Sequence, residues 1–308
     1  LAPAAGSLRP WLVNQLMALE VSGLAESAGD DRWRLRADVT LPATDEIMRW
    51  IAADHPELSA ELLLCADLGA VMSRILAGTL SDAPSLPQAA LDAFCLRGAT
   101  VRASADAVMR LLDDSAAALP RDRALRLLQV GFGPLSAQVA TFAGLHEARL
   151  TVFEADRRLA ERARLALPSG VTIVEDPAQL GLAAFDAVLA SDVLHRASRD
   201  LLTPLAASLA AGGLFAAVEP GASLFRDMVF GLDAGWFEVA GNLPVGRLDD
   251  VAGWQRSLSA VGLVKVAADR AVTRNGNDLL LLAEAPPRPK AAAGQTFAFV
   301  IGSEDEFA

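Results

Sequence analysis

From about residue 124 onward, segments that fit β-strands alternate with segments that fit helices, and this alternation restricts the fold more than any other feature. The apolar runs predict strands over 125–130, 149–153, 171–174, 185–190 and 213–219. The segments between them predict helices over 135–144, 157–167 and 200–211. Such alternation is typical of a mostly parallel, doubly wound α/β sheet. Two later apolar runs surround Asn275-Gly276 and indicate an antiparallel C-terminal hairpin, with strands over 264–268 and 278–283.

The chain before and after this α/β segment has a different character. Residues 1–118 are mostly helical in pattern, which predicts an N-terminal helical, lid-like subdomain ahead of a core over 119–285. A Pro-rich stretch begins at Pro286 and is followed by Ala and Gly, a composition typical of a linker. Residues 295–302 then fit the first strand of another α/β unit. We therefore interpret 286–308 as a linker and the first strand of a following domain in a multidomain protein.

The composition excludes several classes of function. A formal net charge of −11 argues against nucleic acid and anionic membrane surfaces as partners. No apolar run reaches the roughly 18 residues that span a bilayer, and we expect a cytoplasmic protein. The chain has two cysteines and three histidines without metal-ligand spacing, so no metal site is expected.

The first predicted strand of the core runs directly into a Gly-x-Gly turn. Gly131 and Gly133 lie where open α/β sheets bind ligands, and glycines there let the backbone approach a nucleotide-like group. The same pair also fits a tight turn packed under a helix. Glu154 ends the second strand, 23 residues after Gly131, at a spacing that suits hydrogen bonds to ribose hydroxyls. Asp156 is a second candidate for that role, or the cap of the next helix.

Two further side chains follow neighbouring strands of the predicted sheet. His195 comes shortly after the fourth strand, and Glu219 ends the fifth. Because both strand ends lie on the ligand side of a parallel sheet, the two side chains can meet there. A carboxylate beside an imidazole fixes its tautomer and suits it to proton abstraction. The alternative is a histidine that is hydrogen-bonded at a helix start.

Several segments together carry a family resemblance: Asp186–Ala190, Asp192-Val193-Leu194-His195, Ala211-Gly212-Gly213-Leu214, His55-Pro56-Glu57-Leu58 and Leu76-Ala77-Gly78-Thr79-Leu80. Over about residues 1–285 the chain resembles the C-methyltransferase domain of modular or iterative polyketide synthases. The segment after the linker resembles the start of the structural half of a ketoreductase. The resemblance implies a class I methyltransferase fold, a Rossmann-like doubly wound sheet closed by the antiparallel C-terminal hairpin.

The resemblance also implies a chemistry and its residues. S-adenosylmethionine supplies the methyl group in that family, and the substrate is a β-ketoacyl chain on the phosphopantetheine arm of an acyl carrier protein. The family's catalytic His and Glu match His195 and Glu219, and Gly131, Gly133, Glu154 and Asp192 fall at its cofactor site. The implied mechanism removes the proton between two carbonyls, after which the enolate carbon attacks the methyl sulfonium.

The cofactor site departs from the family's pattern. Gln129 stands where an acid is usual, and Pro134-Leu135-Ser136 stands where Thr-Gly-Gly is usual. Pro134 removes a backbone donor, and Leu135 adds bulk where backbone and ligand should approach closely. Asp192 occupies a position often held by Asn. Phe94 is the candidate replacement for a family tyrosine, and the chain contains no tyrosine.

These departures favour a degenerate, non-catalytic structural module of a polyketide synthase that binds no cofactor. The alternative is an active S-adenosylmethionine-dependent C-methyltransferase, because His195, Glu219, Glu154 and both loop glycines are present. A free-standing small-molecule methyltransferase is disfavoured by the linker and the segment after it.

Overall fold

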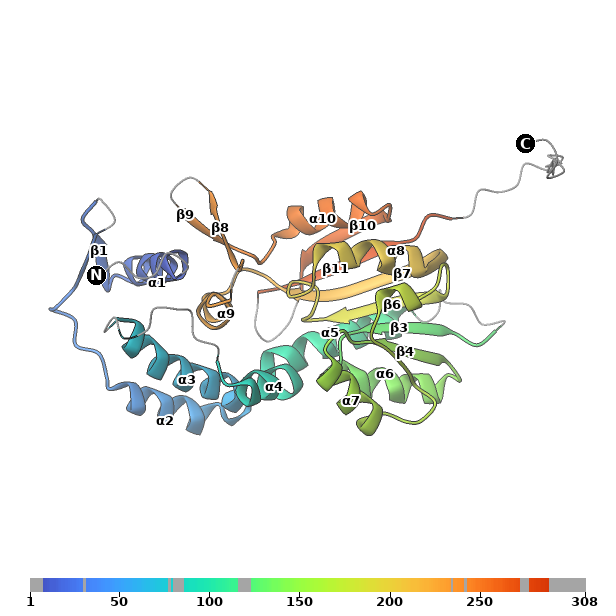
Figure 1. Ribbon diagram of the computed structural model, residues 1–308, viewed down its shortest axis with the longest axis horizontal. Coiled ribbons are helices and arrows are strands. Elements are labelled where there is room, and N and C mark those ends of the chain that lie inside the picture. The colour runs from blue at the N-terminus through green and yellow to red at the C-terminus, as the bar shows by residue number, and fades with distance from the viewer. Residues whose placement is uncertain are drawn as a thin grey trace, which may run out of the picture.

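The computed structural model describes residues 8–29, 32–76, 79, 86–115, 123–233, 235–240, 243–271 and 277–287. Two parts lie side by side, a sheet covered by helices and a smaller, mainly helical part (Figure 1). The predicted turn at Asn275-Gly276 and the segment after Pro287 lie outside the described residues.

Seven strands form the central sheet in the order β10-β11-β7-β6-β3-β4-β5. Their bounds are β3 Arg126–Val130, β4 Arg149–Phe153, β5 Thr172–Val174, β6 Phe185–Ser191, β7 Leu209–Pro220, β10 Val264–Arg270 and β11 Asp278–Glu284. Neighbours from β7 to β5 pair in parallel, whereas β11 is antiparallel to both β7 and β10. The predicted doubly wound sheet with an antiparallel C-terminal strand pair is therefore confirmed.

Helices cover both faces of this sheet, which explains why its central strands are mostly apolar and buried. Every residue of β6 before Ser191 is buried, and its side chains alternate between two cores. Val188 faces the core under α8 (Leu202–Ser208) and α10 (Val251–Ala260), whereas Leu189 faces the core under α5 (Ala99–Ser115) and α6 (Pro134–Leu145). The helix α7 (Arg157–Ala166) follows β4.

One predicted helix ends earlier than expected. The prediction extended a helix over 200–211, but a 3-10 turn over Arg199–Leu201 and the short α8 are followed directly by β7 from Leu209. Leu209 is buried and pairs in register with Phe185 of β6. Pairing with the neighbouring strand thus overrides the local preference of the Leu-Ala-Ala run.

The helical part contains α1 (Arg9–Val21), α2 (Thr44–Asp54), α3 (Ser59–Leu76) and α4 (Gln88–Arg97), with the small ribbon of β1 (Ala25–Ser27) and β2 (Trp33–Leu35). It also takes in α9 (Leu224–Phe230) and the ribbon of β8 (Phe237–Ala240) and β9 (Leu243–Gly246), which follow β7 in the chain. Its core includes the large side chains Trp11, Leu64, Phe94, Phe230 and Trp236.

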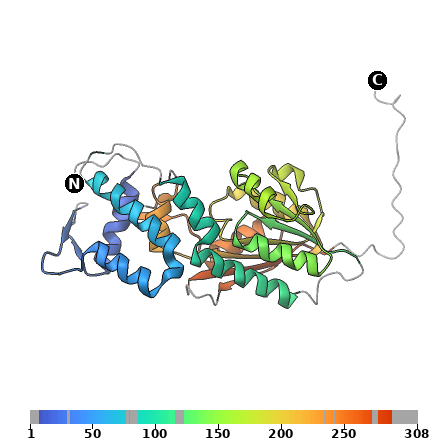
Figure 2. The ribbon, with the colours of Figure 1, turned by 90° about the horizontal axis from the view of Figure 1, so that it is seen from below.

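The division predicted at residue 118 does not match the two parts of the structure. The helix α5 precedes residue 118 but packs on the sheet, whereas α9 follows it but packs in the helical part. The chain passes from the helical part to the sheet between α4 and α5, and α5 packs on the sheet (Figure 2). The return connection from β7 brings α9 back against α1 and α3. The boundary at 118 stays a prediction.

Candidate functional site

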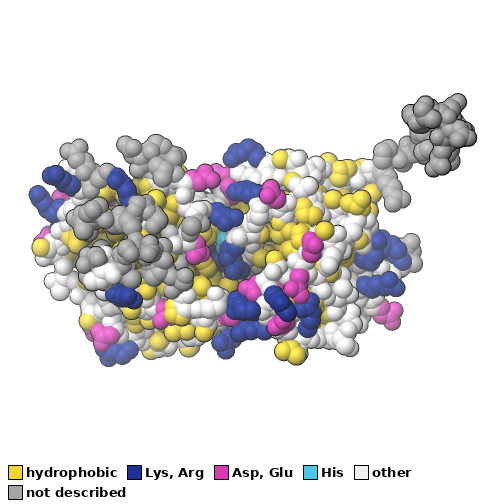
Figure 3. Space-filling model, in the orientation of Figure 1, with side chains coloured by type: hydrophobic (Ala, Val, Ile, Leu, Met, Phe, Trp, Pro, Cys, Tyr) yellow, Lys and Arg dark blue, Asp and Glu magenta, His cyan; other side chains and the backbone are white. Residues whose placement is uncertain are grey.

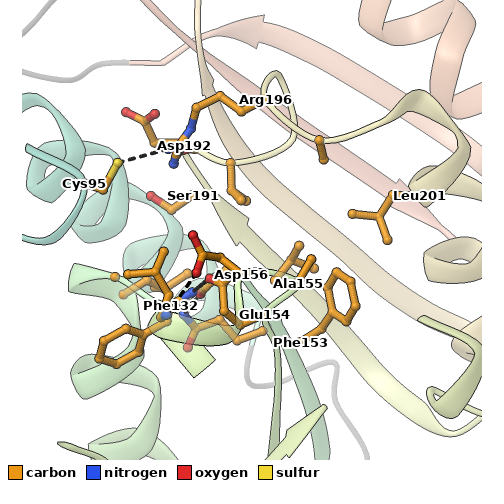
Figure 4. A pocket seen from close by; sticks show the side chains of 18 of the residues that line it. Cys95, Phe132, Phe153, Glu154, Ala155, Asp156, Ser191, Asp192, Arg196 and Leu201 are labelled. Carbon is orange, nitrogen blue, oxygen red and sulfur yellow. Dashed lines mark hydrogen bonds between the residues drawn. The ribbon is translucent and has the colours of Figure 1, made fainter. Parts of the chain in front are cut away.

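A cavity of about 640 Å³ lies at the carboxyl ends of the parallel strands, beside the helical part. Its wall comes from the loop after β3, the end of β4, the segment after β6 and Cys95 of α4. Figure 4 shows these side chains around the opening. This is the place where open α/β sheets bind small molecules, and the volume is of the size that such ligands occupy.

The Gly-x-Gly loop keeps its backbone donors inside the protein. Gly131 N–H donates to the Phe153 carbonyl at 2.8 Å, Phe132 N–H to Glu154 Oε2 at 2.8 Å, and Gly133 N–H to Ser136 Oγ at 3.1 Å. Gly131 has a φ of +80°, which favours glycine, and a Cβ there would lie 2.8 Å from Val193 Cγ2. The absence of a side chain at Gly131 therefore leaves room for Val193 of the same protein.

The residues that depart from the family pattern fit the loop without strain. Pro134 is the first residue of α6, where the missing N–H costs nothing. Leu135 is buried and packs into the core under α5 and α6. Gln129 is buried, and its Nε2 donates to the Gly131 carbonyl and to Ser136 Oγ, both at 2.7 Å. Its Oε1 has no partner in the part of the chain that the structure describes. These side chains support the turn and contribute no charged group to the cavity.

Glu154 and Asp156 were alternative candidates for a ribose contact. Asp156 caps α7, because its Oδ1 accepts from Arg158 N–H at 2.8 Å and from Leu159 N–H at 3.4 Å. Glu154 lines the cavity, but each of its oxygens accepts a backbone N–H, from Phe132 at 2.8 Å and from Asp156 at 2.9 Å. Burial raises the pKa of Glu154, and the two N–H groups oppose that shift.

The structure brings His195 and Glu219 together, as the strand ends predicted. Nδ1 of His195 lies 2.7 Å from Glu219 Oε2, and both side chains are buried. Glu219 also accepts the backbone N–H groups of Val193, Leu194 and His195 at 2.9–3.0 Å. The imidazole–carboxylate pair therefore forms, and His195 lies in a turn held by Glu219 rather than at the start of a helix.

Burial dominates the protonation of this pair. It lowers the pKa of His195 well below its ordinary value and raises the pKa of Glu219. A neutral imidazole that donates through Nδ1 leaves a lone pair on Nε2, and Nε2 is buried without a hydrogen-bond partner among the described residues. This tautomer is the one that a general base needs.

Asp192 lines the cavity, but its carboxylate is bound within the protein. Its φ is +55°, and its carboxylate forms a two-point ion pair with Arg226 of α9, which is also buried. The Arg226 guanidinium lies over the ring of Phe94, 5.3 Å from its centroid. Asp192 Oδ1 is 3.8 Å from His195 Nε2. Asp192 thus connects the segment after β6 to the helical part.

Three arginines and one tryptophan of the site were not found from the sequence: Arg196, Arg226, Arg247 and Trp236. Arg196 follows the candidate base, and its Nη1 donates to Cys95 Sγ at 3.0 Å across the cavity mouth (Figure 4). The adjacency of Arg196 to His195 was the one available signal. The others come from the segment after β7, whose path no local pattern reveals.

In the described part of the chain, no group of three or more His, Cys, Asp or Glu side chains is placed to hold a metal ion. None of its helices has both the length and the apolarity to cross a membrane.

The strand order, with its single antiparallel strand next to the last position, and the helices on both faces define the α/β class I methyltransferase fold. No protein-family model matches the chain, and no curated protein sequence matches it. Among solved structures, the chain is similar in fold to three carbon methyltransferases, one of them a polyketide synthase domain.

Three such structures each cover 92% of this chain. The CMeT domain of the citrinin polyketide synthase has a TM-score of 0.76 at 18% identity, with 80% of that chain covered. CurJ carbon methyltransferase has a TM-score of 0.72 at 17% identity, and DszA carbon methyltransferase 0.67 at 22%, each with 81% of that chain covered. At these identities the likeness is one of fold. Weaker matches include an S-adenosylmethionine-dependent methyltransferase from Mesorhizobium loti, with a TM-score of 0.42.

Proposed function

We propose that this chain is a C-methyltransferase-fold domain of a multidomain polyketide synthase that has lost methyl transfer and serves as a structural module. The observation that carries the loss is the closed hydrogen bonding of the loop after β3. The N–H groups of Gly131, Phe132 and Gly133 are all bonded within the protein, and Pro134 has none. A ligand that enters the cavity meets a loop without free backbone donors from residue 131 to residue 134.

S-adenosylmethionine, the cofactor that the fold implies, does not fit this set of donors well. Its amino-acid end needs charged or N–H partners, but Val193 fills the approach at Gly131 and Gln129 stands where a carboxylate would bind an ammonium group. Both Glu154 oxygens already accept backbone N–H groups, so ribose hydroxyls would compete with them. We therefore assign no step of chemistry to this cofactor here.

Calorimetric titration of the 308-residue chain with S-adenosylmethionine, and separately with S-adenosylhomocysteine, tests this loss. We expect no saturable heat at millimolar ligand and no ligand-dependent rise in the unfolding temperature, since a ligand that binds the native state raises it. Saturable binding of either compound with a 1:1 stoichiometry would overturn the proposal. A second titration with Glu154→Ala checks that any weak heat comes from this cavity.

The second candidate function is active α-carbon methylation of a β-ketoacyl chain on an acyl carrier protein. The 640 Å³ cavity and the His195–Glu219 pair at 2.7 Å favour it. In that function His195 Nε2 takes the proton between the two carbonyls, and Glu219 holds the imidazole. Incubation with a β-ketoacyl carrier protein and methyl donor, followed by mass analysis of the acyl chain, distinguishes the two. Methylation that His195→Ala abolishes would establish the active function.

The wider context is part of the same proposal. We divide the chain into a helical lid-like subdomain over 1–118, a methyltransferase-fold core over 119–285 and a linker with the start of a ketoreductase-like domain over 286–308. Neighbouring synthase domains and an acyl carrier protein are the proposed partners, in the cytoplasm. Limited proteolysis of a longer synthase fragment should cut first within 286–294, since exposed linkers are the preferred sites of nicking.

A further inference from the structure

The loop after β3 is held by two buried polar side chains. Gln129 and Ser136 are 1% and 0% exposed. Nε2 of Gln129 donates to the Gly131 carbonyl and to Ser136 Oγ, both at 2.7 Å. Ser136 Oγ in turn accepts the Gly133 N–H at 3.1 Å. Gln129 therefore connects to both glycines of the loop, directly at Gly131 and through Ser136 at Gly133.

The side-chain amide of Gln129 has one orientation that fits the loop. A backbone carbonyl only accepts hydrogen bonds, so the NH₂ group of the amide has to face Gly131. The oxygen of the same amide, Oε1, is buried and has no partner in the described part of the chain. An ionised carboxylate has no donor, so a glutamate at this position could not bond to the Gly131 carbonyl. The closed form of the loop therefore requires an amide at position 129.

The closed form of the loop removes a donor that a ligand carboxylate would use. Gln129, Gly131 and Gly133 all line the cavity of about 640 Å³. Gly133 immediately precedes α6, and backbone N–H groups at the start of a helix are favourable partners for an anionic group. The Gly133 N–H is already bonded to Ser136 Oγ, and Pro134 has no N–H. A ligand carboxylate therefore finds no donor at either residue.

The carboxylates of the cavity are poorly placed for a ligand ammonium group. Glu154 and Asp156 accept backbone N–H groups, and Asp192 is ion-paired. Asp200 also lines the cavity but is exposed to solvent. Arg196 adds a positive charge to the wall, and Lys and Arg side chains lie along the hollow between the two parts of the molecule (Figure 3). The buried wall of the cavity therefore lacks a free carboxylate, and Gln129 supplies no charge there.

We propose that Gln129 is the specificity-determining residue of this cavity. Its amide holds the loop after β3 in a form that excludes ligands with an amino-acid end, which carries both an ammonium and a carboxylate group. A carboxylate at position 129 would release the Gly131 carbonyl, would weaken the connection to Gly133 through Ser136, and would supply the missing negative charge. The inference rests on the proposed loss of cofactor binding, and it names the residue that causes that loss.

Two measurements on the 308-residue chain test this inference. NMR follows the exchange of the Gly133 N–H in D₂O, which should be about 10-fold faster or more in Gln129→Glu and in Ser136→Ala than in the wild type. Calorimetry compares S-adenosylhomocysteine, which has an amino-acid end, with 5′-methylthioadenosine, which lacks one. Gln129→Glu should bind S-adenosylhomocysteine with a Kd of about 1 mM or lower, whereas the wild type gives no saturable heat. The affinity for 5′-methylthioadenosine should differ less than about 3-fold between the two proteins.

Gln138→Glu is the matched control, because it makes the same chemical change in a side chain that binds Asp106 and does not line the cavity. It should leave the Gly133 exchange rate and ligand binding unchanged.

Three results would overturn the inference: unchanged exchange in Ser136→Ala, no binding of S-adenosylhomocysteine by folded Gln129→Glu, or an equal gain in affinity for 5′-methylthioadenosine. If Gln129→Glu does not fold, the exchange rate of Ser136→Ala decides, because that change alone frees the Gly133 N–H. Binding of S-adenosylhomocysteine by the wild type would instead overturn the proposed loss of the cofactor, so the two failures are distinguishable.

Discussion

The site has two halves that are built differently: the base half around His195 and Glu219, and the cofactor half formed by the loop after β3 and Glu154. In the base half, Glu219 binds the Nδ1 of His195 and three consecutive backbone N–H groups, and Asp192 ties the same segment to Arg226 of the helical part. In the cofactor half, the N–H groups of the loop after β3 donate to the Phe153 carbonyl of β4, to Glu154 and to Ser136 Oγ of α6, all within the sheet part of the molecule. The carboxylate of the base half therefore has a folding role that does not depend on catalysis. A His–Glu pair in this fold is thus weak evidence for methyl transfer.

The largest expected effect comes from Arg226→Met, which cuts the base half from the helical part. Removal of one partner from a buried ion pair leaves Asp192 uncompensated, and we expect a loss of about 3–5 kcal/mol in the free energy of unfolding. Urea unfolding followed by tryptophan fluorescence measures it. Asp192→Asn combined with Arg226→Met should cost less than the sum of the single changes. A loss below about 1 kcal/mol for Arg226→Met would show that the connection contributes little.

A second comparison concerns how much the carboxylates of Glu219 and Glu154 each contribute to the free energy of unfolding. Glu219→Gln leaves one oxygen to serve four donors in a fully buried site, so we expect a loss of about 2–3 kcal/mol. Glu154→Gln affects two donors at a cavity edge and should cost about 1 kcal/mol. Paired unfolding curves at neutral pH measure the difference. Equal losses would contradict the view that the base half is the more strongly organised of the two.

The sequence predicts the sheet well because its signals are local. Mostly apolar runs predict the buried strands, and the meeting of His195 with Glu219 follows from the neighbouring carboxyl ends of β6 and β7. The cap formed by Asp156 could be stated only as an alternative, since a carboxylate before a helix serves equally well for a ligand. The end of α8 at Ser208 was missed because strand pairing at Leu209 is a long-range effect.

The charged groups around the base could not be predicted for a related reason. Arg226 lies 34 residues after Asp192, on a helix that the chain reaches only by returning to the helical part. No periodic pattern encodes that return, and a lone arginine on a short helix resembles any surface arginine. The sequence also could not show that the N–H groups of the loop after β3 are bonded within the protein. Glu154 has the same spacing from Gly131 whether it binds a ribose or the Phe132 N–H.

The pH dependence of stability gives the smallest but most specific test of the base half. The imidazole of His195 faces carboxylates and guanidiniums from four segments: Glu219 of β7, Asp192 and Arg196 of its own segment, Arg226 of α9 and Arg247 after β9. Because burial lowers its pKa far below the ordinary 6.5, the unfolded chain binds a proton near pH 6.5 that the folded chain does not. The folded state therefore loses stability as the pH falls below about 6.5, and recovers it as the pH rises through that value.

His195→Gln removes this titration, so the difference in unfolding free energy between wild type and variant should shrink as the pH falls from about 7 to 5. The expected slope is at most about 1.4 kcal/mol per pH unit. Glu219 contributes in the opposite direction, since its raised pKa stabilises the fold at low pH, but it is present in both proteins. A gap that widens as the pH falls toward about 6 would show that the two carboxylates raise the pKa of the imidazole and keep it protonated in the fold. In that case Nε2 would carry a proton and could not act as the base, so the same measurement decides between a dyad poised to remove protons and one that only holds a turn.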